Sequence, residues 1–284
     1  YYRVLFKPGY PVQARELTGL QSMLQNQIEK FGQHFFKEGS KIIPGNTSYS
    51  QNYTCVQLNN QFQGVPVAAY ADQLVGTVIT GQTSGVTANV SQILSAEDSE
   101  NGNLTLYVDY LGSNTSNNST ATFLDAEELS CNTIISSGLL GNTSISIGSP
   151  FASTISNGAA QTGSAFHVEN GVYFVRGQFV SVESQTLILD QYRSNPSYKV
   201  GFNIVEEIIT PDLDETLNDN SQGFNNYSAP GADRLKISLV LSKTALDINL
   251  TGAAGGGSDV IDDTFVELSS VDSGTLRSEK TVKL

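Results

Sequence analysis

The sequence has 284 residues, with 15 Lys and Arg against 28 Asp and Glu, and a formal net charge of -13. This charge excludes a general nucleic-acid-binding surface, because a phosphate backbone repels a field of its own sign. The two cysteines, Cys55 and Cys131, are too few and too far apart for a disulfide framework or a thiolate zinc site. No apolar run approaches the roughly 18 residues that a membrane helix needs, so we expect no membrane partner.

Charged residues make up only 15% of the chain, against about 25% in ordinary soluble domains. Ser, Thr, Asn, Gln and Gly take their place, which is typical of extracellular and virion fibres and favours an exposed structural protein. The sequence starts at Tyr1 without the pattern of a signal peptide, and its last residues lack a terminal character. We therefore expect an N-terminal segment of a longer chain.

The strongest helical pattern covers residues 11–38. Pro11 suits the first turn and Gly39 suits the exit. The apolar positions step by three or four residues, which is the helical period: Leu17, Leu20, Leu24, Ile28, Phe31 and Phe35. Two interpretations are open. The helix packs on one sheet, or its apolar residues form an oligomer seam that meets two copies of itself around a threefold axis.

After Gly39 the apolar pattern changes to the period of two that is typical of strands. Short strands are expected at residues 55–58, 73–80, 86–94, 104–110 and 121–124. Asn101-Gly102 between two of them is a hairpin signal. Strands this short and evenly spaced indicate a small barrel or sandwich, and we predict an inserted β module at 66–135.

Residues 136–165 show little periodicity and are predicted to be irregular. Strands resume as a meander at 172–175, 179–182 and 186–189, followed by strands at 200–209 and 235–241. The glycine-rich run 252–257 is typical of a flexible linker. The fold class is therefore mainly β with one long N-terminal α-helix, and a β-sandwich or barrel framework carries an inserted small β module. The expected domains are 1–65 (helix and first strands), 66–135 (module), 136–243 (framework) and 244–284 (linker and start of a next module).

The polar connection 210–233 is unusually long for a compact domain. It carries four large apolar residues, Leu213, Leu217, Phe224 and Tyr227. A free surface loop has no need of them. We expect an interface loop that lies ordered against its own β domain or against a neighbouring subunit.

No pattern of catalytic or cofactor-binding residues stands out. His34 and His167 each lack a second His, Cys or carboxylate at metal-ligand spacing and are interpreted as structural. Nucleophile-elbow and phosphate-binding loop patterns are absent from the sequence. We expect neither enzymatic activity nor a cofactor.

The loop acids Asp212, Asp214, Glu215 and Asp219 leave a calcium site open, because alternating acids can bind Ca²⁺. However, Thr216 occupies the next alternate position, and Leu217 stands where a calcium loop needs Gly. Solvated turn acids are the favoured interpretation, and no metal is expected.

Several blocks resemble a family of bacteriophage virion proteins. Residues 6–21 follow the pattern FxPGxxVQARELxxLQ, and residues 31–45 follow FGxHxFKEGSxxIPG. Residues 173–180, 196–202 and 226–235 look like the same family, and the Gly/Thr-rich stretch 76–90 resembles a small β unit of phage tail proteins. These blocks are similar to those of tail, baseplate-wedge and tail-fibre structural proteins of contractile-tailed marine and cyanobacterial phages.

The resemblance implies a late structural protein without catalysis, which forms a homotrimer and contacts other tail, baseplate or fibre proteins. It implies a place in the virion, in the tail or baseplate, after assembly in the host cytoplasm. The expected function is therefore a structural component of a phage tail baseplate or tail-fibre attachment apparatus. The alternative is a receptor- or glycan-binding tail fibre or tailspike. Trp is absent, however, and neither parallel β-helix repeats nor paired carboxylates of a degrading tailspike are evident.

Overall fold

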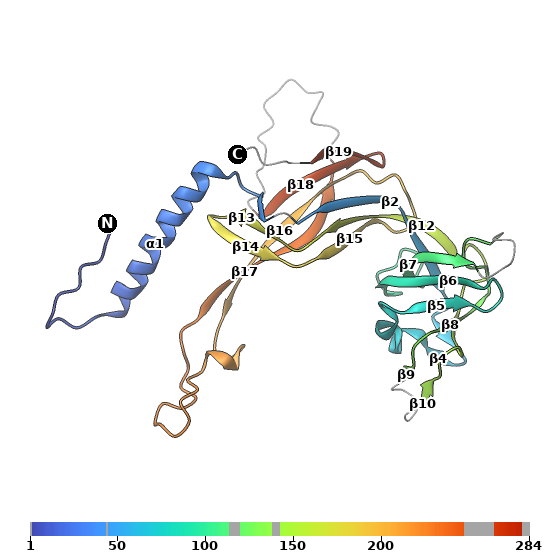
Figure 1. The fold of residues 1–284 in the computed structure, drawn as a ribbon, viewed down its shortest axis with the longest axis horizontal. Coiled ribbons are helices and arrows are strands. Elements are labelled where there is room, and N and C mark those ends of the chain that lie inside the picture. The colour runs from blue at the N-terminus through green and yellow to red at the C-terminus, as the bar shows by residue number, and fades with distance from the viewer. Residues whose placement is uncertain (1, 44, 114–119, 138–142, 247–263, 280–284) are drawn as a thin grey trace. The chain divides into compact units, whose positions relative to one another are not determined.

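The computed structural model describes residues 2–43, 45–113, 120–137, 143–246 and 264–279. These residues are mostly β with a single N-terminal α-helix, as the sequence predicts (Figure 1). The helical elements are α1 (Ala14–Phe35) and the short 3-10 helices η1 (Val67–Ala69), η2 (Ala71–Leu74) and η3 (Glu215–Leu217). The strands are β1 (Ser40–Ile43), β2 (Thr47–Leu58), β3 (Gln61–Phe62), β4 (Val65–Pro66), β5 (Val78–Gly81), β6 (Val86–Leu94), β7 (Leu104–Ser113), β8 (Glu128–Cys131), β9 (Ile135–Ser137), β10 (Thr143–Ile145), β11 (Pro150–Ser153), β12 (Ala160–Val168), β13 (Gly171–Val175), β14 (Gln178–Val182), β15 (Gln185–Asp190), β16 (Tyr198–Ile209), β17 (Arg234–Ala245), β18 (Phe265–Asp272) and β19 (Thr275–Glu279).

The chain divides into two compact units. Unit 1 comprises Tyr1–Ser48, Phe166–Leu187 and Ser197–Leu284, and unit 2 comprises Tyr49–Ala165 and Ile188–Pro196. The expected module 66–135 lies inside unit 2, which is larger than that module. The expected linker 252–257 lies outside the described residues, as do 247–263 and 280–284 of the expected segment 244–284.

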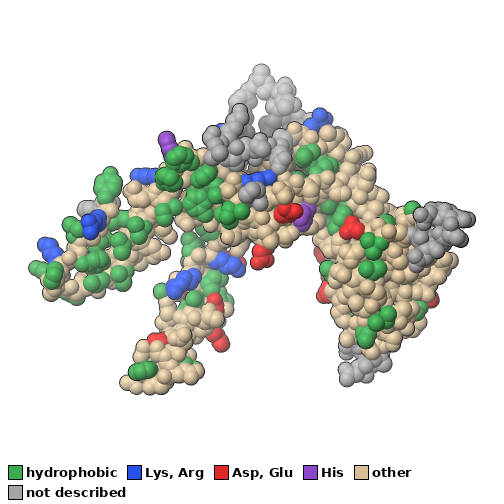
Figure 2. Space-filling view, in the orientation of Figure 1, with side chains coloured by type: hydrophobic (Ala, Val, Ile, Leu, Met, Phe, Trp, Pro, Cys, Tyr) green, Lys and Arg blue, Asp and Glu red, His purple; other side chains and the backbone are tan. Residues whose placement is uncertain are grey.

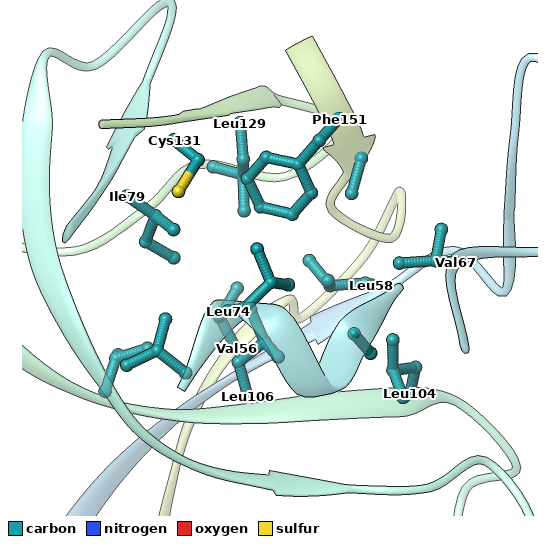
Figure 3. Close-up of a cluster of buried hydrophobic side chains, with 14 of the residues drawn as sticks. Val56, Leu58, Val67, Leu74, Ile79, Leu104, Leu106, Leu129, Cys131 and Phe151 are labelled. Carbon is teal, nitrogen blue, oxygen red and sulfur yellow. The ribbon is translucent and has the colours of Figure 1, made fainter. Parts of the chain in front are cut away.

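Unit 2 contains five whole strands and parts of β2, β12 and β15 from an eight-stranded sheet with the order β11-β8-β5-β6-β7-β2-β12-β15. Its edge strands are β11 and β15, so the described strands do not close into a barrel. One face carries a continuous apolar core (Figure 3). Leu58, Leu74, Ile79, Leu129 and Phe151 are fully buried there, and burial of each such side chain contributes about 1.5–3 kcal/mol.

Unit 1 is a sandwich of two antiparallel sheets, with the orders β1-β13-β14 and β17-β16-β18-β19. The sheets meet through Tyr173 of β13 and Phe202 of β16, whose ring centroids lie 4.9 Å apart in an edge-on arrangement. Both side chains are buried. Successive side chains of a strand point to opposite faces, so Phe174 faces the other way and packs against the end of helix α1. Strand β13 is therefore buried on both faces.

Helix α1 is shorter than the predicted 11–38. It begins after Gln13, whose N–H donates to the Glu16 carboxylate at 2.5 Å, so this pair caps the first turn. Pro11 therefore lies before the helix and not in its first turn. The helix ends at Phe35, and Gly39 follows with a φ of +80°, a conformation that favours glycine.

Strands β16 and β17 extend beyond their sheet as a two-stranded ribbon. The outer half of β16 pairs only with β17, because β18 pairs with residues 198–203 of β16. The apolar face that is buried at Ile204 and Leu239 continues to the cross-strand pair Ile208 and Leu235, which is exposed. We call the ribbon of residues 204–209 and 234–239, together with residues 210–233, the arm, and residues 210–233 the arm loop (Figure 1).

Several sequence predictions of local structure are wrong. Residues 136–165 were expected to be irregular, but their described part contains β10, β11 and the start of β12. Residues 121–124 are not a strand, and only 78–80 of the predicted strand 73–80 is extended. The predicted meander is also wrong for its third strand, because β15 pairs with β12 and not with β14.

Candidate interaction surfaces

The apolar residues of helix α1 are uncovered in this chain. Leu17, Leu24, Ile28, Phe31 and Phe35 are all exposed, and Leu20 is partly buried. Spacings of three and four residues place all six on one face of the helix, and the Phe31 and Phe35 rings are in contact at 4.8 Å between centroids. The interpretation that the helix packs lengthwise on a sheet is therefore wrong for the single chain. Figure 2 shows hydrophobic side chains on the surface of the helix in the single chain. A seam between copies remains a prediction.

Only the C-terminal end of α1 is anchored. Gly32 is the one buried residue of the helix, and a Cβ at this position would overlap the ring of Phe174. Just beyond the helix, Phe36 contacts both Phe174 and Phe179, at 5.9 and 6.1 Å between ring centroids. The sandwich thus holds the helix at one end and leaves its apolar stripe accessible.

The arm loop is folded on itself. Its two halves are joined by a pair of backbone hydrogen bonds, from Asp219 N–H to Ala229 O at 2.9 Å and from Ser228 N–H to Asp219 O at 2.8 Å. A Cβ on Gly231 would overlap the carbonyl of Leu217, so the chain passes itself closely here. The loop is ordered by its own contacts.

The apolar side chains of the arm loop stay outside. Leu213 and Phe224 are each 72% exposed, Tyr227 is exposed, and Leu217 is partly buried. The expected packing of the loop against its own β domain is therefore not observed for these three exposed side chains. Contact with a neighbouring subunit remains a prediction.

The loop acids shape the loop. Asp214 accepts hydrogen bonds from the Thr216 hydroxyl at 2.6 Å and its N–H at 3.0 Å, and these bonds lower the pKa of Asp214. Asp219 accepts from Ser221 N–H at 2.8 Å and from the Asn226 amide at 2.7 Å, and its pKa is lowered by the same cause. Hydrogen bonds favour the charged form of a carboxyl group.

No metal-ligand cluster forms around these acids. Among the residues that the structure describes, no three His, Cys, Asp or Glu side chains come together in a way that could hold a metal ion. The loop lines an open pocket of about 500 Å³, whose polar side chains include Glu215, Asp219 and Tyr227.

The other reactive side chains lie apart from one another. His34 is exposed on α1 beside the ring of Phe35, and His167 Nδ1 lies 2.8 Å from the Thr186 hydroxyl. Cys55 and Cys131 are free and buried in unit 2, and burial raises the pKa of the Cys55 thiol to about 12. A buried thiol with a raised pKa is a poor nucleophile, so Cys55 is a packing residue.

Sequence reasoning missed a third exposed apolar surface, at residues 2–13. Leu5, Phe6, Tyr10 and Val12 are exposed there and line a cavity of about 280 Å³. Because this segment has neither helical nor alternating periodicity, only its high apolar and aromatic content could have drawn attention to it.

Comparison with known protein families gives a match for one part of the chain. A family model described as a domain of unknown function, DUF4815, matches residues 152–253. The match starts within β11 and runs through β17, so it includes the arm but not helix α1. No curated protein and no solved structure matches the chain. No helix among the described residues has the length and apolar character to span a membrane.

Proposed function

We propose that the chain is a structural subunit of a bacteriophage tail baseplate or tail-fibre attachment apparatus. In this role it assembles with copies of itself, as a homotrimer, and with other tail, baseplate or fibre proteins. The motif resemblance of residues 6–21 and 31–45 supports the virion setting.

The observation that carries the proposal is the uncovered stripe of α1. Phe31 is 63% exposed and Leu24 is 58% exposed, whereas the interiors of both units are well buried. An apolar surface of this kind marks an interaction site. Three copies of α1 would bury their stripes against one another around a threefold axis.

The test is quantitative mass spectrometry of purified particles of a phage that encodes the chain, compared with tailless heads from the same lysate. The proposal expects peptides of the chain in complete particles, in a fixed ratio to the other tail proteins, and their loss from tailless heads. Absence from complete particles contradicts it. A position at the distal tip of a fibre would favour the receptor- or glycan-binding alternative.

A further inference from the structure

We infer that the arm loop of one copy docks onto the N-terminal segment, residues 2–15, of a second copy. The inference rests on the self-association proposed above and names the two surfaces that meet. Both surfaces belong to unit 1.

The N-terminal segment is apolar and basic. It carries Arg3, Lys7 and Arg15, and it contains no Asp or Glu. The turn at Lys7 to Tyr10 is closed by a hydrogen bond from Tyr10 N–H to Lys7 O at 3.3 Å, and Gly9 supplies the positive φ of +84° that this turn requires. Lys7 lines the cavity of this segment together with Leu5, Phe6, Tyr10 and Val12. Glu16 of helix α1 also lines it, and its carboxylate accepts a hydrogen bond from Gln13 N–H. Because three basic side chains stand against this one acid, the surface keeps a net positive charge.

The arm loop has the same apolar character with the opposite charge. Residues 210–233 contain no Lys, Arg or His, and their five acids are Asp212, Asp214, Glu215, Asp219 and Asp233. Exposed Leu213 and Phe224 supply apolar side chains of a size that the N-terminal cavity can receive.

The opposite charges of the arm loop and the N-terminal segment therefore favour binding between these two surfaces. Opposite potentials across an interface favour the correct partner and orientation, and here both partners are present in every copy. A contact between two different patches on successive copies closes into a ring when the rotation permits it, as in a trimer. The arm loop is already ordered by its own hydrogen bonds, so docking costs little conformational entropy.

The experiment measures the concentration at which the chain is half assembled, by sedimentation velocity. One variant reverses the basic surface, with Arg3→Glu and Lys7→Glu. A second reverses the acidic surface, with Asp212→Lys and Glu215→Lys. Asp214 and Asp219 are left unchanged because they form hydrogen bonds within the loop.

Each charge-reversed variant is expected to need about tenfold more protein for half assembly. The chain with all four substitutions should recover the original value, because its surfaces are again complementary. Mixing the two variants should produce mixed complexes that neither forms alone. Higher ionic strength should weaken the original and the fourfold variant alike.

The matched control is Lys30→Glu with Lys37→Glu, which changes the net charge equally at exposed positions outside both surfaces. It should leave half assembly unchanged. A second variant, Phe224→Ser, removes the most exposed aromatic group of the loop without changing charge and should also weaken assembly.

Three outcomes overturn the inference. The first is that the fourfold variant assembles as poorly as its parents. The second is that it recovers while the two mixed variants stay apart, which would place the contact within one chain. The third is that the unchanged chain remains monomeric throughout. That last result would remove self-association but not the virion role, because the mass spectrometry of particles tests that role separately.

Discussion

Glu127 is a charged residue that the interior of unit 2 is built to hold. Its side chain is 2% exposed. One carboxylate oxygen accepts from the N–H groups of Thr83 and Ser84, and the other accepts from Leu124 N–H at 2.9 Å and from the Ser84 hydroxyl at 3.0 Å. A Cβ on Gly81 would meet the Glu127 carboxylate, so this strand leaves room for it. The residue ties the 121–127 loop to the sheet.

Replacing Glu127 by Gln should destabilise unit 2 by about 1–3 kcal/mol, because an amide NH2 would face donors that now share a carboxylate oxygen. The measurement is the free energy of unfolding from urea titration. Glu128→Gln is the matched control, because the neighbouring side chain is exposed and the charge change is the same. Equal effects of the two substitutions would show that the buried hydrogen bonds of Glu127 contribute nothing.

The two glycines of helix α1 should respond in opposite ways to substitution by alanine. At Gly19 a Cβ meets nothing within 4 Å, so Gly19→Ala should stabilise the helix by about 1 kcal/mol through its better helix propensity. At Gly32 the added methyl overlaps the Phe174 ring, so Gly32→Ala should loosen the anchored end despite the same gain in propensity. Limited proteolysis within residues 36–40 measures this: faster cleavage is expected for Gly32→Ala only. Equal cleavage of both variants would contradict the anchoring.

At the scale of elements, the apolar face of helix α1 is exposed and does not pack against the rest of its own chain. Its stripe is exposed from Leu17 to Phe35 except at the partly buried Leu20, and only Gly32 of the helix is buried. A helix in water gains most of its stability from packing its apolar face. If copies meet as we propose, we expect the helix to gain its main stabilising contacts there.

Leu24→Asp should convert the assembled chain to monomer. A carboxylate in the middle of the seam would lose its water without gaining a partner, at a cost of about 3–5 kcal/mol. Asn26→Asp is the control, because residue 26 lies on the opposite face of the helix and is exposed. Light scattering at micromolar concentration gives the mass of each variant. A monomer for the unchanged chain, or dissociation by both substitutions alike, would contradict the seam.

Some elements could be predicted from the sequence and others could not. Strand β6 was predicted with its observed bounds, because Val86, Ala88 and Val90 alternate with polar residues and Gly85 marks its start. Strand β12 was missed because its buried residues include Ala165 and Ser164, which carry little hydrophobic signal. Its place comes from tertiary pairing: a Cβ on Gly163 would overlap backbone oxygens of Asp190 and Gln191, so the strands lie unusually close. No local sequence pattern predicts that these two distant segments lie so close together.

For the interaction surfaces too, the sequence predicts one part and only the structure shows the other. The period of three and four residues in α1 predicts that Leu24 and Phe31 share a face, but not whether their own chain covers it. For the arm loop, composition drew attention to Phe224 and Tyr227, and the structure adds that they are exposed. The ribbon beneath the loop follows from the length difference between β16 and β18, which depends on strand register.

At the scale of the whole molecule, unit 2 should lose stability at alkaline pH. Burial raises the pKa of the Cys55 thiol from 9.0 to about 12, and the pKa values of Tyr70 and Tyr110 from 10.0 to about 12. All three lie in unit 2. The unfolded chain loses these protons at a lower pH than the folded chain, so rising pH favours unfolding. Their contribution to stability is complete below about pH 9 and is lost toward pH 12.

The measurement is urea unfolding between about pH 8 and pH 11, followed by hydrogen exchange that resolves the two units. Unit 2 should lose stability progressively. Tyr70→Phe should flatten this dependence, although it lowers stability at neutral pH by about 1 kcal/mol because the Phe151 carbonyl loses its donor at 2.6 Å. A constant free energy of unfolding across the range would contradict the assignment.

We propose that this chain is a self-assembling structural part of a phage tail. A cryo-electron microscopy reconstruction of the intact tail tests it most directly, because it gives location, stoichiometry and contacts together. We expect three copies around an axis in the baseplate or fibre-attachment region, with Leu24 and Phe31 of α1 buried between them. Density that places the chain outside the tail, or in the tail with α1 facing solvent in every copy, would contradict it.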